Sequence, residues 1–197
     1  MSAIGKSISH TIRYFLGLEP AHTQTTHAER ECLANFATGK QRLVEIGVYE
    51  GVTTRLLANQ IDSNATLLAI DPFFPGKLGI CWGRFIAKRE VHLSANTSSV
   101  MFIERFSYDA VSEVEGNLDF IFIDGDHSLE GIKRDWIDWS DKVAQNGIIA
   151  LHDTRVPNHN PRIAELGSFQ FFESHIRHDS RFKLIGQIDS LSVLQRL

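Results

Sequence analysis

The feature that most constrains this sequence is a series of short apolar runs separated by helix-like stretches. The run 118–124 is apolar at almost every position, as expected for a strand that is covered on both faces. Similar runs occur at 42–48, 66–71, 100–106 and 148–153. Strands that alternate with helices predict an α/β fold with a mostly parallel sheet and right-handed crossovers.

Helical patterns lie between these runs. Thr26 and Glu29 form a capping-box pattern that predicts a helix to about residue 37. A second helix is predicted over 52–61. Over 129–143 apolar residues recur every three or four positions, which predicts a helix with both of its tryptophans in the core.

Three segments are expected to depart from this alternation. The stretch 73–99 is rich in glycine and aromatic residues and is expected to be a looser connection. The tail 182–195 predicts two strands with no helix between them, which favours an antiparallel hairpin at one edge. Apolar residues at helical spacing between Ile4 and Leu16 predict an amphipathic helix that packs on the domain or on a second copy of the chain. We therefore expect a helical segment at 1–38, acting as a lid or oligomer contact, and a catalytic domain at 39–197.

Composition narrows the range of partners. The chain has 197 residues, a formal charge of −4 and a pI near 6.1, which argues against nucleic acid or an anionic membrane as the main partner. Two cysteines without a CxxC pairing predict a reducing, cytoplasmic location rather than a disulfide framework.

Acidic residues stand at or near the ends of four predicted strands: Glu45, Asp71, Asp124 and Asp153. In parallel sheets, ligands bind at the carboxyl ends of the strands. The four residues are therefore expected to converge on one crevice.

One end of this crevice suits a nucleotide-like ligand. Gly47 and Gly51 permit a tight turn that brings backbone amides to a ligand, and Thr53 follows at the start of a helix. Asp71 suits the two hydroxyls of a ribose. The dinucleotide pattern GxGxxG fails and no phosphate-binding lysine motif is present, so a ligand with an amino-acid tail is favoured over a dinucleotide.

The other end suits acid–base or metal chemistry. Asp124 and His127 follow the fourth strand, and His152 and Asp153 follow the fifth. Carboxylate and imidazole groups at neighbouring strand ends favour Mg²⁺ or Mn²⁺, which would stabilise a deprotonated hydroxyl, with His127 taking the proton. The alternative for each residue is a structural role, as a helix cap or a buried hydrogen-bonded histidine.

At this point the residues resemble a known family. The segment Glu45-Ile-Gly-Val-Tyr-Glu-Gly-Val-Thr53 resembles the first motif of catechol and caffeoyl-CoA O-methyltransferases. The segments 122–135 and 147–154 are more similar to bacterial class I methyltransferases related to macrolide-sugar O-methyltransferases and cephalosporin-hydroxylase-type proteins. The resemblance implies a Rossmann-like seven-stranded sheet of order 3-2-1-4-5-7-6, with the last strand antiparallel and helices on both faces.

The resemblance also assigns roles to residues. His127 would be the catalytic base, and Asp124, His152 and Asp153 would be the metal positions, although the relatives carry an acid where His152 stands. The residues that would bind S-adenosylmethionine are Glu45, Gly47, Tyr49, Gly51, Thr53, Asp71, Ser107, Tyr108 and Asp124.

The sequence therefore predicts an S-adenosylmethionine-dependent O-methyltransferase that is assisted by a divalent metal ion and methylates a hydroxyl of a sugar or other small metabolite. No nucleic-acid or membrane partner is expected. A metal-dependent hydrolase on the same fold is the alternative, but it leaves Glu45, the glycines and Asp71 without a function. A binding module without catalysis leaves His127 and His152 unexplained.

Overall fold

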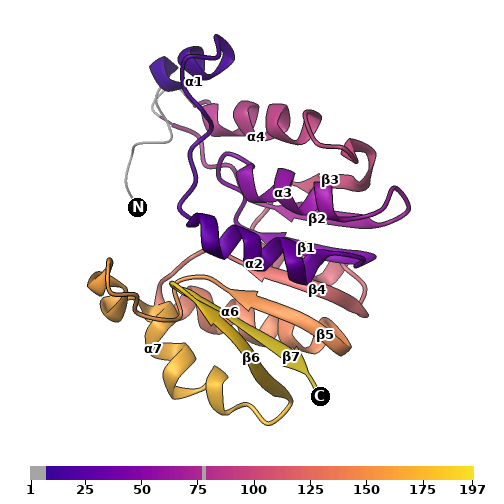
Figure 1. Ribbon diagram of the computed structural model, residues 1–197, viewed down its shortest axis with the longest axis vertical. Coiled ribbons are helices and arrows are strands. Elements are labelled where there is room, and N and C mark those ends of the chain that lie inside the picture. The colour runs from indigo at the N-terminus through magenta and orange to yellow at the C-terminus, as the bar shows by residue number, and fades with distance from the viewer. Residues whose placement is uncertain (1–7, 77–78) are drawn as a thin grey trace.

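A seven-stranded sheet runs through the molecule in the order β3-β2-β1-β4-β5-β7-β6 (Figure 1). The computed structural model describes residues 8–76 and 79–197. The strands are β1 (Arg42–Ile46), β2 (Thr66–Ile70), β3 (Val100–Ile103), β4 (Leu118–Ile123), β5 (Val143–Leu151), β6 (Phe182–Ile188) and β7 (Leu191–Arg196). Neighbouring strands from β3 to β5 are parallel, whereas β7 is antiparallel to both β5 and β6. The predicted sheet order and antiparallel last strand are confirmed.

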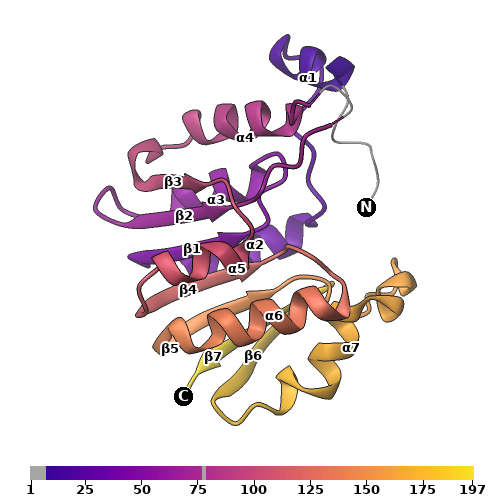
Figure 2. The ribbon, with the colours of Figure 1, turned by 180° about the vertical axis from the view of Figure 1, so that it is seen from behind.

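Helices cover both faces of the sheet (Figures 1 and 2). They are α1 (Ile8–Phe15), α2 (His27–Ala37), α3 (Val52–Gln60), α4 (Trp82–His92), α5 (Ser107–Ala110), α6 (Leu129–Trp139) and α7 (Gly167–Ser174). Short 3₁₀ helices lie at Thr97–Ser99, Val111–Glu113, Ser140–Lys142, Pro161–Glu165 and Ile176–His178. Helices α2, α3 and α4 pack on one face, and α5, α6 and α7 pack on the other.

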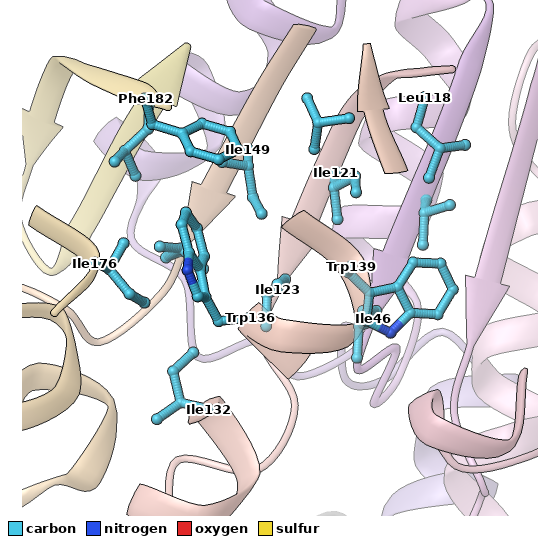
Figure 3. Close-up of a cluster of buried hydrophobic side chains, with 14 of the residues drawn as sticks. Ile46, Leu118, Ile121, Ile123, Ile132, Trp136, Trp139, Ile149, Ile176 and Phe182 are labelled. Atoms are coloured by element: carbon cyan, nitrogen blue, oxygen red, sulfur yellow. The ribbon is translucent and has the colours of Figure 1, made fainter. Parts of the chain in front are cut away.

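The alternation of side chains along β4 shows how the two halves of the core are built. Phe120 and Phe122 point into the half that contains α2 and α3, whereas Ile121 and Ile123 point toward α6. On α6, Trp136 and Trp139 are buried against the second half, as their helical spacing predicts (Figure 3). A central strand covered on both faces therefore explains the apolar run at 118–124.

One sequence expectation about the connections is wrong. The stretch 73–99 contains α4, whose buried face packs against β2 and β3. The final hairpin is antiparallel with no helix between its strands, as predicted. The connection from β5 to this hairpin contains α7, which was not predicted from the sequence and whose phenylalanines join the core beside α6.

The predicted amphipathic N-terminal helix is present as α1, although Ile4 lies outside the described residues. Helix α1 packs against α4 and leaves Ile12, Phe15 and Leu16 exposed beside Trp82 and Phe85 of α4, around a groove of about 360 Å³. None of the predicted catalytic residues lines this groove. Within the described part of the chain, no helix is long and apolar enough to cross a bilayer.

Candidate functional site

The carboxyl ends of β1, β2 and β4 bring three predicted acidic residues to one edge of the sheet. The backbone N–H of Asp124 donates to the carbonyl of Ile46 (2.8 Å), which joins the end of β4 to the end of β1. Glu45 is fully buried, and its pKa is raised well above the usual value, first by burial and then by the charges of Asp124 and Asp71. Glu45, Asp71 and Asp124 therefore share one electrostatic environment.

The glycines after β1 are required by close packing. Gly47 has φ +89°, and a Cβ there would lie 2.1 Å from the carbonyl oxygen of Asp124. Gly51 has φ +78°, and a Cβ there would lie 2.8 Å from the Cα of Ala87 on α4. The loop between β1 and α3 can thus pass directly against the end of β4. This contact brings the predicted cofactor end of the crevice next to its predicted acid–base end.

Asp71 holds this loop from the end of β2. Its Oδ2 accepts hydrogen bonds from the backbone N–H groups of Val48 (2.9 Å) and Tyr49 (3.1 Å), and its Oδ1 accepts one from Phe73 (2.7 Å). Tyr49 and Phe73 both adopt left-handed φ values, of 55° and 46°. Because a carboxylate has about four acceptor positions, Asp71 can fix the loop and still accept from a ligand hydroxyl.

The predicted adenine-binding residues lie at the end of β3. Ser107 donates from Oγ to Oδ1 of Asp135 on α6 (2.5 Å). The ring of Tyr108 lies under the guanidinium of Arg134, 3.6 Å from its carbon. Thr53 lies buried in the first turn of α3. Their contact with a cofactor stays a prediction.

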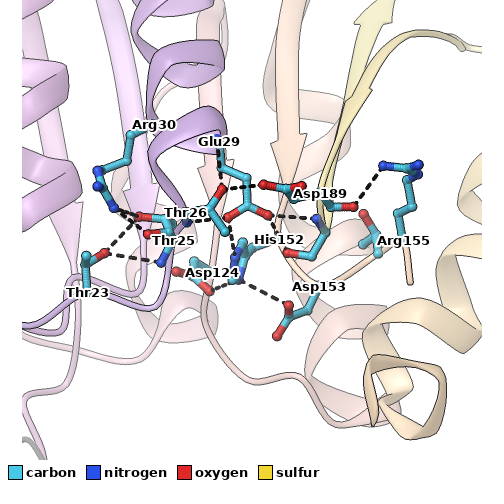
Figure 4. A network of polar contacts seen from close by, with 12 residues as sticks. Thr23, Thr25, Thr26, Glu29, Arg30, Asp124, His152, Asp153, Arg155 and Asp189 are labelled. Carbon is cyan, nitrogen blue, oxygen red and sulfur yellow. Dashed lines mark hydrogen bonds and ion pairs between the residues drawn. The ribbon is translucent and has the colours of Figure 1, made fainter. Parts of the chain in front are cut away.

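At the end of β5, His152 is buried between two carboxylates (Figure 4). Its Nδ1 lies 2.9 Å from Oδ1 of Asp124, and its Nε2 lies 3.4 Å from Oε2 of Glu29. Burial alone would lower the pKa of His152, but the interactions with Asp124, Glu29 and Asp153 raise it well above its usual value. The surrounding acids therefore favour the protonated form of the imidazole.

Sequence reasoning missed Glu29 as a member of this cluster. Its Oε2 accepts from the backbone of Thr26 (2.7 Å), which completes the predicted capping box of α2. Its Oε1 accepts from the backbone N–H (2.8 Å) and Oγ (2.6 Å) of Ser190. Although burial opposes ionisation, the bonds from His152, Ser190 and Thr26 lower the pKa of Glu29 to about 2. The capping box explained Glu29 locally, so nothing in the sequence pattern indicated its second role.

His127, the predicted base, lies half-buried between Asp124 and Asp153. Its Nε2 is 3.4 Å from Oδ1 of Asp124, and its Nδ1 is 3.7 Å from Oδ2 of Asp153. Burial lowers the pKa of His127, but the two carboxylates raise it further than burial lowers it. Asp153 has φ +52°, in the left-handed region that aspartate adopts more readily than most residues other than glycine. Asp126 instead accepts from the backbone and hydroxyl of Ser128 before α6.

The donor atoms present suit a divalent metal ion. One donor atom each of Asp124, His127 and His152 lies within 4.8 Å of the others. Among the described residues, Asp124 Oδ1 and both ring nitrogens of His152 are buried without a well-aligned hydrogen bond. Mixed carboxylate and imidazole donors fit Mn²⁺ better than Mg²⁺. His152 would have to release a proton to become a ligand.

Comparisons with known proteins agree with this geometry. A family model described as a methyltransferase domain (Methyltransf_24) matches residues 44–154, more than half of the chain. An uncharacterised protein, R132, of Acanthamoeba polyphaga mimivirus is 28% identical over 156 residues, which are 71% of this chain and 65% of that protein. The chain thus spans a little under two thirds of the length of that relative.

Solved structures share the fold at low sequence identity. An O-methyltransferase from Bacillus cereus, solved in complex with SAH, aligns with a TM-score of 0.67 and 15% identity, over 100% of this chain and 92% of that one. The O-methyltransferase TomG from Streptomyces achromogenes, in complex with SAM, gives a TM-score of 0.64 at 12% identity, over 100% and 91% of the chains. A methyltransferase from Geobacter sulfurreducens gives 0.65 at 16% identity, over 97% of each chain.

The matched segment 44–154 begins within β1 and ends just after Asp153, so it includes the glycine loop, Asp71, Asp124 and both histidines of the cluster. The chain therefore belongs to this family of methyltransferase domains.

Proposed function

We propose that the protein transfers the methyl group of S-adenosylmethionine to a hydroxyl oxygen of a small metabolite, with a divalent metal ion assisting. The family match over 44–154 carries this proposal, because it spans both the glycine loop and the His127 cluster. The B. cereus and TomG structures, solved with SAH and SAM, support the choice of cofactor. A hydrolase would give no function to the loop that Asp71 and Gly47 build.

The residues at the ends of β1 and β2 would bind the cofactor. Both carboxyl oxygens of Glu45 are buried without a partner among the residues described, which suits a ligand ammonium group. Asp71 would accept from the ribose hydroxyls while it holds the loop. Thr53 and the first turn of α3 would face the methionine carboxylate, since helix N-termini bind anions.

His127 would take the proton of the acceptor hydroxyl. The flanking carboxylates of Asp124 and Asp153 raise its basicity and would stabilise the imidazolium that forms. Attack of the resulting oxygen on the methyl group then merges a negative oxygen with a positive sulfur. Because charge disappears in this step, a half-buried site with fixed dipoles favours it.

By the family resemblance, Asp124, His152 and Asp153 would hold the metal ion, which leaves His127 free to act as the base, although the donor atoms within 4.8 Å of one another are those of Asp124, His127 and His152. Such an ion, when bound, supplies electrostatic stabilisation for a deprotonated acceptor oxygen. If His127 is instead a ligand, as its distance from Asp124 permits, His127→Ala will weaken Mn²⁺ binding. Unchanged Mn²⁺ affinity in that variant supports the assignment as base.

Calorimetry with S-adenosylhomocysteine, in the presence and absence of Mn²⁺ or Mg²⁺, tests the proposed function. We expect binding of one molecule per chain under all conditions, and full activity only when the metal is present. Failure of S-adenosylhomocysteine to bind would contradict the proposal. Full activity in the presence of a chelator would contradict the role of the metal ion but not the proposed methyl transfer.

We predict that His127→Ala lowers turnover on the order of 10²–10⁴-fold, the usual contribution of a general base. S-adenosylhomocysteine affinity should stay unchanged, because His127 lies outside the glycine loop. His178→Ala, at an exposed position, is the matched control. The acceptor for the assay comes from a screen of sugars and other hydroxylated metabolites, with methyl-donor consumption as the readout. Unchanged turnover in His127→Ala excludes the assignment as base.

A further inference from the structure

The segment before α2 is attached directly to the glycine loop. Glu50, which lies between Tyr49 and Gly51, is fully buried. Its Oε2 accepts from the backbone N–H of His22 (2.6 Å) and lies 3.0 Å from Nε2 of His10 on α1. The carboxylate of a residue inside the predicted cofactor motif therefore points toward the N-terminal segment.

His10 extends this connection along α1. Its Nδ1 lies 2.9 Å from Oε2 of Glu19, so its ring bridges two carboxylates. Burial lowers the pKa of His10, but Glu19 and Glu50 together raise it above its usual value. Arg13 pairs with the other oxygen of Glu19 (2.6 Å). These contacts favour a protonated His10 beside the buried Glu50.

A second polar contact joins α1 to the helices beside the loop. Tyr14 donates from its hydroxyl to Oε1 of Glu90 on α4 (2.5 Å), and Arg55 of α3 donates to Oε2 of the same residue (3.1 Å). Helix α3 begins directly after the glycine loop. Helix α1 is therefore linked both to the loop and to the helix that continues it.

The loop needs such support because its backbone is strained. Tyr49 has a left-handed φ of 55°, and Oε1 of Glu50 is buried without a hydrogen-bond partner within residues 8–76 and 79–197. A buried carboxylate that loses a close cationic neighbour is strongly destabilised. Without His10, Glu50 would keep only the backbone N–H of His22 and the more distant His22 imidazole, whose Nδ1 lies 4.0 Å from Oε1, among its described neighbours. The loop would then shift to bring Glu50 to water.

The cluster of His10, Glu19 and His22 also has spacing that a metal ion could use. Its ring geometry favours an ion-pair network instead. The rings of His10 and His22 are stacked, with centroids 3.8 Å apart and planes only 12° from parallel. The lone pairs of stacked imidazoles lie in separate planes and do not converge on one ion, and each nitrogen of His10 already faces a carboxylate.

We propose that His10 and Glu50 are positioning residues for the cofactor, and that the N-terminal segment thereby forms part of the S-adenosylmethionine site. This segment lies outside the matched region 44–154, and the inference rests on the proposed function only in that the glycine loop binds the cofactor. The N-terminal segment raises cofactor affinity by holding the loop in its binding conformation.

Titration with S-adenosylhomocysteine tests this inference in the full chain. We expect His10→Ala and Glu50→Gln each to weaken binding about tenfold or more. Tyr14→Phe, which removes a single hydroxyl, should weaken it by a smaller factor. His27→Ala is the matched control, because His27 is 79% exposed on α2 and pairs only with Glu31 among its charged neighbours in the described chain. Circular dichroism and thermal unfolding verify that each variant is folded.

The double variant His10→Ala/Glu50→Gln separates positioning from general damage. Glu50→Gln removes the charge that His10 compensates, so the losses of S-adenosylhomocysteine affinity in the two single variants should be far from additive. The double variant should bind S-adenosylhomocysteine nearly as well as the single variant with the lower affinity. Wild-type binding together with unchanged affinity in both single variants would overturn this inference alone. Additive losses would also overturn it, as would a stoichiometric metal ion that is retained by the wild type and lost in His10→Ala. No binding by the wild type would overturn the proposed function and this inference with it.

Discussion

Three buried acids near the site have different pKa values because their surroundings stabilise the ionised carboxylate to different degrees. Glu29 receives hydrogen bonds from several donors, which lower its pKa to about 2 and keep it ionised. Glu45 has no well-aligned hydrogen-bond donor among the described residues, and burial raises its pKa well above the usual value against the opposing effect of the nearby Thr54 hydroxyl. Asp135 lies between these cases, with burial raising its pKa to about 6 against one hydrogen bond from Ser107. The first favours folding at neutral pH, whereas the other two oppose it when ionised.

We predict that Asp135→Asn stabilises the protein at pH 8 but not at pH 4. Since the folded-state pKa of Asp135 is about 6 and the usual value for an aspartate is 3.8, the native state binds the proton more tightly than the unfolded chain. Stability therefore falls as pH rises from about 4 to 6, by up to about 3 kcal/mol. Urea unfolding of both proteins at the two pH values measures this difference. An equal effect at both pH values would contradict it.

We predict that Gly47→Ala lowers the free energy of unfolding by about 3 kcal/mol or more. A Cβ at Gly47 would meet the backbone of Asp124, which cannot move without displacing β4, and its φ of +89° disfavours alanine. Gly116→Ala is the control, because a Cβ there has nothing within 4 Å. In urea unfolding, the control should change the free energy of unfolding by less than about 0.5 kcal/mol. A similar loss in both variants would show that the close approach is not the cause.

At the scale of elements, α2 connects the acid cluster to the final hairpin. Thr26 accepts from the backbone N–H of Glu29 (3.2 Å) and donates from Oγ1 to Oδ2 of Asp189 (2.7 Å), between β6 and β7. Glu29 bonds Ser190 in the same turn. The N-terminus of α2 is therefore capped and also fixed to a segment more than 160 positions away.

We predict that Thr26→Ala costs about 1–2 kcal/mol, the upper part of the range for a lost cap, because it also removes the bond to Asp189. Thr38→Ala at the other end of α2 is the control, since Thr38 is exposed and bonds Ala34 of its own helix. It should cost less than about 0.5 kcal/mol. Thermal unfolding of the two variants compares them. Equal losses would exclude a specific role for the cap.

The sequence predicted most strands and the helices α2, α3 and α6, because each has an apolar period or a capping signal. Helix α4 was missed because its buried face includes Gly83 and Glu90, which interrupt the apolar pattern. Glu90 can be buried because Tyr14 and Arg55, distant in sequence, bond it. Likewise, Glu29 reaches His152 only through tertiary packing. Local patterns located Asp71, Asp124 and His152 at strand ends but could not reveal partners of this kind.

At the scale of the molecule, the sheet order decides where the two ends of the site lie. Strand β1 pairs with both β2 and β4, so the loop held by Asp71 and the end of β4 with Asp124 are adjacent. The sheet order was predicted from the family resemblance, whereas the strand pattern alone predicted only a mostly parallel sheet with an antiparallel hairpin at one edge. A ligand in this crevice would contact both halves of the sheet and stabilise the whole fold.

We predict that S-adenosylhomocysteine at about 100 times its Kd raises the free energy of unfolding by about 2.7 kcal/mol. Asp71→Ala should remain folded but lose most of this increase, because the loop loses its acceptor for two backbone amides and the ribose loses its partner. Thermal unfolding with and without ligand measures both effects. An undiminished ligand shift in Asp71→Ala would exclude Asp71 from the cofactor site.

The position of β7 has a consequence for synthesis on the ribosome. Residues 191–196 insert between β5 and β6, so β5 has an open edge until these residues have left the exit tunnel. The turn before them also carries Ser190, so the hydrogen bonds from Ser190 to Glu29 cannot form until this turn has been synthesised. Nascent chains arrested before this point would expose an unpaired strand and an incomplete acid cluster, and are thus the species most in need of chaperone protection.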